Sequence, residues 1–165
     1  NMEEAAYCME QATDRCKMYC GEKNQMYSAM SEELARMYNA AGRREESLAC
    51  HLAVRNQLLK NGYREGSMLL MVDNNMSVVY LDLGRPEEAI PYLTEALELT
   101  KENGLVGSAV AEPTWNLARV YRALGDEEKE DIYLKAAVEG FRECYPPEHP
   151  KRIAAEQRLK ERQGE

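Results

Sequence analysis

The sequence has little of several residue types and patterns. It contains one Phe, one Trp, two His and six Pro among 165 residues. No apolar run approaches the ~18 residues that a membrane-spanning helix requires, and the N-terminus lacks the basic and then apolar pattern of a secretory signal. Basic residues are outnumbered, with 21 Lys and Arg against 29 Asp and Glu and a formal net charge of -8. This acidic balance argues against nucleic acid or an anionic membrane as a partner.

The cysteines and the motif content indicate neither a disulfide framework nor an enzyme. The cysteines are odd in number and are not arranged as a dense framework, which suits a reduced, cytoplasmic setting; they are Cys8, Cys16, Cys20, Cys50 and Cys144. Cys16 and Cys20 lie one helical turn apart and Cys50 precedes His51, but no second CxxC or His pair completes a metal-ligand set. We expect buried small residues there instead. With no Gly-rich phosphate loop, Ser/His/Asp set or dinucleotide fingerprint, the sequence predicts no catalytic site, no metal and no cofactor.

The chain does contain a regular internal repeat. Apolar residues make up 44% and charged residues 30%, with ten Tyr and nine Met, which suits a folded helical protein forming one domain over residues 1–165. Tyr38, Tyr80 and Tyr121 are 42 and 41 residues apart. Gly42, Gly84 and Gly125 follow each of them four residues later and keep the same steps. Self-similarity at a fixed period predicts stacked structural units.

Each unit is predicted to consist of two helices. The first ends at the Tyr-x-x-x-Gly, where glycine can adopt the left-handed conformation that terminates a helix. The second begins at once, with Pro86 in a first turn and two glutamates that complement the helix dipole. We expect Pro91 to kink its helix mildly, since proline lacks a backbone donor. The expected helices cover residues 3–19, 24–40, 44–60, 67–82, 86–102, 109–123, 127–143 and 149–163.

Small residues recur on one face of these helices. Ala89 and Ala96 are seven apart and therefore share a face. We expect them to be small because neighbouring helices approach closely there, and a larger side chain would separate the pair. A repeat that cannot bury its own face obtains its core from the next repeat. Glu130 takes the corresponding small position of the last full unit, which puts close packing there in doubt.

These marks resemble the tetratricopeptide repeat (TPR). The pattern is clearest at Met76-Ser77, Tyr80, Gly84, Ala89, Leu93 and Ala96, and again at Leu117-Ala118, Tyr121, Gly125, Leu134 and Ala137. The period exceeds the usual ~34 residues and is similar to the 42-residue variety of kinesin light chains. The resemblance implies an all-α solenoid of antiparallel helix hairpins in a right-handed superhelix of about seven to eight helices. Its units would be a half repeat over 3–22, repeats over 23–63, 64–105 and 106–146, and a C-terminal half repeat or cap over 147–163.

The resemblance also implies a concave groove lined by the first helix of each unit, which receives a peptide or a partner's segment. The groove residues are predicted to be Arg36, Met71, Asn74, Asn75, Val78, Glu112, Trp115, Asn116, Arg119, Arg122 and Arg158. Further groove-facing positions are Glu32, Glu33, Asp82, Ala154 and Gln157.

Each group of predicted groove residues has an alternative role that does not involve a ligand. The equivalent carboxamides of Asn75 and Asn116 either bind a peptide backbone or solvate the surface. Trp115 is either an apolar anchor for a ligand or part of the packing between helices. The groove arginines either receive acidic groups or pair with the abundant glutamates.

The sequence therefore predicts a non-catalytic scaffold that binds a protein or peptide partner. One alternative is a peptide-sensing regulatory segment of a larger bacterial regulator. The other is a structural homo-oligomer, formed through faces of the terminal repeats that have no further repeat to stack on.

Overall fold

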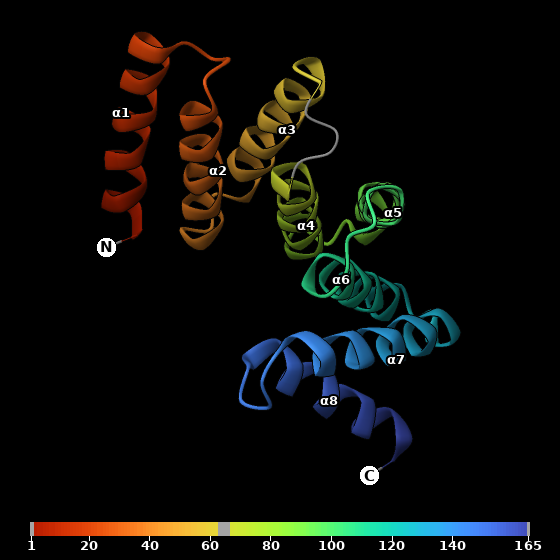
Figure 1. Cartoon of the computed structure of the whole chain (residues 1–165). Helices are drawn as coiled ribbons and strands as arrows, with labels where there is room; N and C mark the ends of the chain where they lie inside the picture. Colours follow the sequence, from red (N-terminus) through yellow and green to blue (C-terminus); the bar gives the residue numbers. More distant parts are fainter. Residues whose placement is uncertain (1, 63–66, 165) are drawn as a thin grey trace. The chain divides into compact units, whose positions relative to one another are not determined.

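The computed structural model describes residues 2–62 and 67–164. In these ranges the chain forms α-helices and one short 3-10 helix, and no strand (Figure 1). The elements are α1 (Met2–Cys20), α2 (Gln25–Ala40), α3 (Arg44–Lys60), α4 (Ser67–Asp82), η1 (Pro86–Ala89), α5 (Ile90–Glu102), α6 (Ser108–Leu124), α7 (Glu127–Cys144) and α8 (Pro150–Gln163). The predicted all-α class is confirmed, and each predicted helix has its counterpart.

The helix ends follow from local chemistry that the sequence displays. Gly42, Gly84 and Gly125 all have positive φ, between 70° and 82°, and follow the ends of α2, α4 and α6. At Gly125 the backbone N–H donates to the carbonyls of Arg122 and Tyr121, which closes the last turn of α6. At the other end, the side chain of Asp126 caps α7 by accepting the Lys129 N–H at 3.1 Å.

The predicted helix over 86–102 is wrong in its first turn. Residues Pro86–Ala89 form a 3-10 helix, and α5 begins only at Ile90. Pro91 has no N–H for the carbonyl of Glu87, which accepts the N–H of Ile90 instead. Pro91 therefore lies in the first turn of a new α-helix, where its missing donor has no cost, rather than inside a mildly kinked one.

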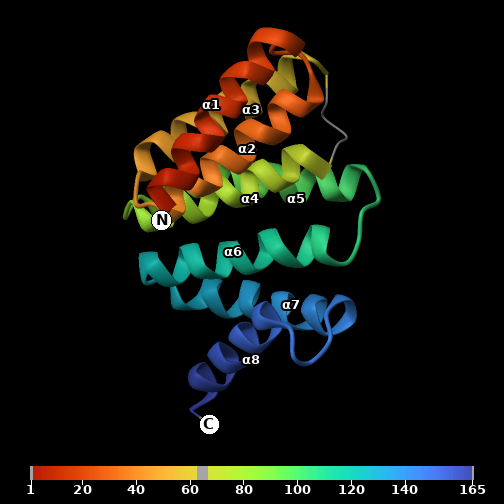
Figure 2. The ribbon, with the colours of Figure 1, turned by 90° about the vertical axis from the view of Figure 1, so that its left-hand side faces the viewer.

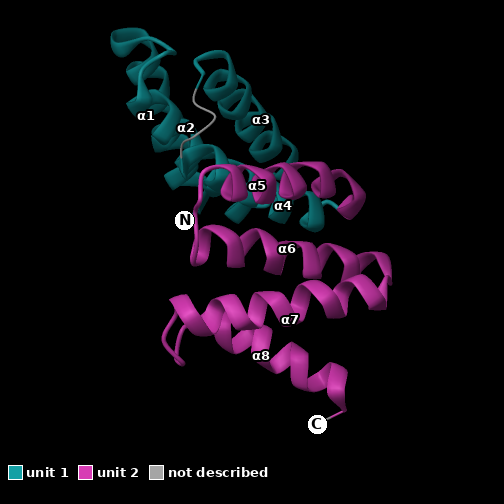
Figure 3. Cartoon of the chain, turned by 45° about the vertical axis from the view of Figure 1, so that its right-hand side comes forward, with its two compact units in different colours: residues 1–83 teal, residues 84–165 magenta. Residues whose placement is uncertain are grey.

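The chain divides into two compact units, residues 1–83 and residues 84–165 (Figure 3). In the first unit, α1, α2 and α3 lie side by side as antiparallel hairpins (Figures 1 and 2). Its core includes Ala6, Leu34 and Tyr38, with Met9, Met37 and Cys50 packed against them. The single domain over 1–165 and the repeat boundaries given above stay predictions.

The second unit has its core between α6, α7 and α8. Its buried cluster consists of Ala111, Ala118, Leu134, Val138, Phe141 and Ala155. Ala89 and Ala96 are fully buried, as expected of a close helix contact. The repeat pattern does not predict another close approach: a Cβ added to Gly140 would lie 2.8 Å from the Cβ of Ala111. α6 and α7 therefore touch almost backbone to backbone at this point.

The cysteines only partly match the expectation. All five lie in the described part of the chain and are free thiols. Cys16 is buried, but Cys20 is exposed, which corrects the expectation of a buried residue there. In the same ranges, no set of three or more His, Cys, Asp and Glu side chains is placed to hold a metal ion. None of the described helices is both long and apolar enough to cross a membrane.

Candidate functional site

A small cavity in the first unit brings several predicted groove residues together. Its volume is about 240 Å³. Arg36, Asn75 and Val78, all predicted from the sequence, line it. The other lining residues are Asn39 and Ala40 of α2, His51 of α3 and Val79 of α4. None of these four is among the predicted groove residues, although Arg36, Asn39 and Ala40 have the three- and four-residue spacing that places side chains on one helix face.

A buried polar network lies at one side of this cavity. Glu32 and His51 are 2% and 1% exposed. His51 Nδ1 lies 2.9 Å from one carboxylate oxygen of Glu32, and Asn75 Nδ2 donates to the other at 2.8 Å. The Glu32 carboxylate thus joins α2 to both α3 and α4. The prediction that Glu32 faces the groove is wrong. Glu32 is buried instead, and its carboxylate contacts His51 of the neighbouring helix α3.

The network fixes the orientation of the Asn75 side chain. An ionised carboxylate can only accept hydrogen bonds. The amide of Asn75 must therefore present its nitrogen to Glu32, which turns its oxygen away from that carboxylate. The contact with Glu32, which does not line the cavity, therefore determines that the free acceptor of the Asn75 side chain is its amide oxygen.

A second buried ion pair holds α4 against α3. Arg55 Nε donates to Asp73 Oδ1 at 2.7 Å, and Asp73 is fully buried. A charged hydrogen bond in a buried setting has a narrow range of good geometry. It therefore limits how α4 can rotate or slide on α3, and with it the position of Asn75 and Val78. No motif or repeat position indicates this pair, whose members lie 18 residues apart.

The other predicted residues of the first unit lie at the surface. Arg36 is exposed and pairs with Glu33 at 2.8 Å, one turn away on the same helix. Such an exposed pair contributes little to stability, about 0–1 kcal/mol, and is easily exchanged for another anion. Met71 is 42% exposed, and Asn74 is half-buried. Arg36 can therefore turn toward a ligand at little cost.

In the second unit, α6 carries most of the predicted residues, and several are already engaged. Glu112 accepts a hydrogen bond from Tyr145 and pairs with Lys151 at 2.6 Å. Burial, and to a smaller extent this hydrogen bond, raises the pKa of Tyr145 to about 12. Trp115 is half-buried and meets the edge of Phe141 at a ring distance of 6.4 Å. Of its two interpretations, packing between helices describes what the indole does here.

The predicted arginines and Asn116 differ in their surroundings. Asn116 is 7% exposed and accepts a hydrogen bond from Arg119 at 3.3 Å, whereas Arg122 is exposed. Arg158 binds Glu130 through two hydrogen bonds, of 2.7 and 3.1 Å, and this contact raises the pKa of Arg158. Glu130 is 3% exposed, so the acid that occupies a small-residue position is buried with Arg158 as its partner. Arg158 thus pairs with a glutamate, the alternative given for it above.

Comparison with known proteins identifies the repeat. Residues 68–143 match the tetratricopeptide repeat family. No curated protein matches the sequence.

Solved structures match nearly the full length of the chain. A Podosopora anserina protein, described as a kinesin light chain with nearly identical TPR-like repeats, is 23% identical to this chain and has a TM-score of 0.78. The match covers 99% of this chain and 79% of the Podosopora anserina chain. A variant form of the same protein has the same identity and coverage and a TM-score of 0.81. BtubC (BKLC) from P. vanneervenii is 18% identical, with 99% and 73% coverage and a TM-score of 0.78. Residues 68–143 therefore match the tetratricopeptide repeat family, and the chain as a whole has the all-α helical-repeat fold of these kinesin light chain-like structures.

Proposed function

We propose that this protein is a non-catalytic interaction scaffold that binds an extended segment of a protein partner at the cavity between α2 and α4. Tetratricopeptide repeats are protein-interaction repeats, and the fold supports that general role. The observation that carries the finer proposal is the cavity itself, where Arg36, Asn75 and Val78 meet.

The chemistry of the cavity suits a peptide better than a cofactor. Ligand pockets for drug-sized molecules occupy about 300–1,000 Å³, whereas this cavity has about 240 Å³. It can hold one side chain of moderate size. Ala40, Val78 and Val79 offer that side chain an apolar surface. The Asn75 oxygen can accept a main-chain N–H beside it.

The charge at the cavity adds a preference. Arg36 lies at the surface and is held only by the exposed pair with Glu33. An acidic group of the partner can replace that glutamate and form two hydrogen bonds with the guanidinium. The preferred segment is therefore extended, with a small apolar residue next to an acidic one.

The proposal is tested by selection of peptides from a random phage-displayed library on the unmodified protein. The selected peptides are then titrated against Val78→Lys, which places a long charged side chain over the cavity. We expect the affinity to fall at least about tenfold, because the apolar side chain loses its place.

Ile132→Lys is the matched control, since Ile132 is a β-branched residue of α7 that is 59% exposed and lies outside the cavity. It should leave the affinity unchanged. Circular dichroism shows whether both variants stay folded. Equal binding by the two lysine variants would contradict the proposed site.

Two alternatives stay predictions. A regulatory role requires that peptide binding shifts the stability of the chain, which the same titrations report as a change in thermal midpoint. Homo-oligomerisation through a terminal repeat is supported by α1, which exposes Tyr7, Met18 and Tyr19 at 61%, 75% and 82%. We also propose a cytoplasmic location, which rests on the free thiols.

A further inference from the structure

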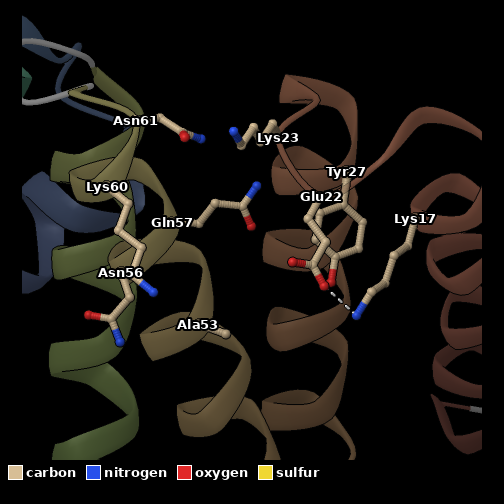
Figure 4. Close-up of a pocket in the computed structure, with 9 residues that line it drawn as sticks. All are labelled: Lys17, Glu22, Lys23, Tyr27, Ala53, Asn56, Gln57, Lys60 and Asn61. Atoms are coloured by element: carbon tan, nitrogen blue, oxygen red, sulfur yellow. Dashed lines mark ion pairs between the residues drawn. The ribbon is translucent and has the colours of Figure 1, made fainter.

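A second and larger cavity lies at the other end of α2. It has a volume of about 610 Å³ and is bounded by the end of α1, the start of α2 and the second half of α3 (Figure 4). Tyr27, near the start of α2, lines this cavity, whereas Ala40, its last residue, lines the smaller one. The thirteen residue steps from Tyr27 to Ala40 correspond to about 20 Å along the helix, and the two cavities are distinct because they share no lining residue.

This cavity is basic in an otherwise acidic protein. Lys17, Lys23 and Lys60 line it, against the single carboxylate of Glu22, while the chain as a whole carries a net charge of -8. Lys17 is engaged by Glu22 at 2.5 Å. The hydrogen bond and charge of Lys17, and to a smaller extent the charge of Lys60, hold the pKa of Glu22 below its ordinary value. Lys23 comes from the segment before α2 and reaches toward Asn61, whereas Lys60 comes from the end of α3 and lies beside Asn56 (Figure 4).

The cavity also contains a donor that the folded chain leaves unused. Gln57 extends from α3 into the space between α3 and α2 (Figure 4). Its Nε2 atom is buried and has no hydrogen-bond partner among the described residues. A buried amide without a partner costs stability. The Gln57 amide and the ammonium groups of Lys23 and Lys60 therefore give the cavity more hydrogen-bond donors than acceptors.

We propose that this cavity binds the side-chain carboxylates of an acidic peptide segment, a second binding site on the first unit. A carboxylate supplies an acceptor for the exposed ammonium groups of Lys23 and Lys60, and the buried Gln57 Nε2 atom, which has no partner among the described residues, reaches it by a rotation of the side chain. The cavity also has carboxamides from Asn56 and Asn61, which can both donate to and accept from a peptide backbone. Lining arginines, whose planar fork is the commoner bidentate partner of a phosphate, are absent from the described residues of the cavity. A peptide carboxylate therefore fits better than a phosphate.

The test uses the full chain and two labelled peptides that differ only in charge. The first is acetyl-Gly-Glu-Asp-Glu-Gly-amide, and the second carries Gln and Asn in place of Glu and Asp. Fluorescence anisotropy should show binding of the acidic peptide at least about tenfold tighter than that of the neutral one. Lys23→Gln combined with Lys60→Gln should weaken the acidic peptide by about tenfold.

Two controls separate the site from charge and from folding. Lys101→Gln combined with Lys160→Gln removes the same charge from exposed positions of the second unit and should leave binding unchanged. Gln57→Met keeps the side-chain volume but removes the amide; it should weaken binding and raise the thermal midpoint, because the unused donor disappears. A destabilised Gln57 variant would show that the amide has a partner and would contradict the argument.

The remaining outcomes also decide the proposal. No binding of the acidic peptide by the unmodified protein would overturn it. An equal loss in both lysine double variants would overturn it too, since long-range charge alone would then account for binding. If free succinate displaced the peptide at equal concentration, the site would be one for small dicarboxylates and the peptide assignment would be wrong. Val78→Lys should bind the acidic peptide normally, which keeps this test apart from that of the smaller cavity.

Discussion

Replacing Gly140 by alanine should destabilise the protein, although the same change stabilises most helices. Gly140 lies inside α7, where alanine is favoured over glycine by about 1 kcal/mol. Here the added Cβ would lie 2.8 Å from the Cβ of Ala111 and 3.5 Å from its Cα. Carbon atoms rest at about 3.5–4.0 Å, and a Cβ cannot move without its backbone. The helices must therefore separate, at a cost of roughly 1–3 kcal/mol, which leaves a net loss of about 1 kcal/mol.

The partner residue provides a matched second change. Ala111→Gly alone should cost about 2 kcal/mol, since it loses helix propensity and a buried methyl group. In the double variant, Gly140→Ala with Ala111→Gly, the methyl group moves from one helix to the other and the propensities cancel. Its stability should therefore return to within about 0.5 kcal/mol of the parent. The two sites should show a coupling energy of about 3 kcal/mol, at the upper end for residues in contact.

Urea unfolding followed by circular dichroism measures the four free energies. Ala136→Gly is the control for propensity, because Ala136 is exposed on the same helix; it should cost about 1 kcal/mol. If Gly140→Ala were as stable as the parent or more stable, α6 and α7 would not approach as described. Additive effects of the two changes would lead to the same conclusion.

Two further predictions concern the polar contacts of α7. Arg158→Met should lower the free energy of unfolding by about 2 kcal/mol, because it leaves the buried Glu130 carboxylate without its partner. The control is Lys160→Met, at an exposed position of the same helix. This control should leave the free energy of unfolding unchanged in the same urea assay. The Lys129 backbone N–H lowers the pKa of Asp126, so near its unfolded value of about 4 the native state binds fewer protons than the unfolded state. Stability should then fall as the pH drops through the folded pKa, and Asp126→Asn should reduce that fall in acid titrations.

The helices were predictable because their ends carry local signals. Gly125 adopts the left-handed conformation that its place after the Tyr-x-x-x requires, and Asp126 caps the next helix directly. These signals act over four residues or fewer, so they are visible in the sequence alone. Pro91 marks where such reasoning fails. Its missing donor predicts a kink, yet the chain forms a 3-10 turn before it.

The candidate site was only partly predictable, for a different physical reason. Helical periodicity places Arg36 and Asn75 on a defined face of their helices. It does not say which residue of another helix faces them. Glu32 and Asn75 are 43 positions apart, and His51 lies between them in sequence. That Glu32 is buried and holds both residues therefore depends on helix packing, which no spacing in the sequence encodes. The contact of Gly140 with Ala111 was missed for the same reason.

The buried polar contacts fix how the helices are rotated and shifted against one another, which small alanine side chains do not. Small residues let two helices approach, but a smooth interface leaves their rotation and sliding weakly defined. Hydrogen bonds are directional, so the Glu32 contacts with His51 and Asn75 admit one arrangement of three helices. Because the carboxylate accepts only, the same contacts decide which atom of Asn75 faces the cavity. The residues that make the fold specific thus also set the chemistry of the cavity, and for that reason the proposed binding site includes Glu32, although this carboxylate is buried.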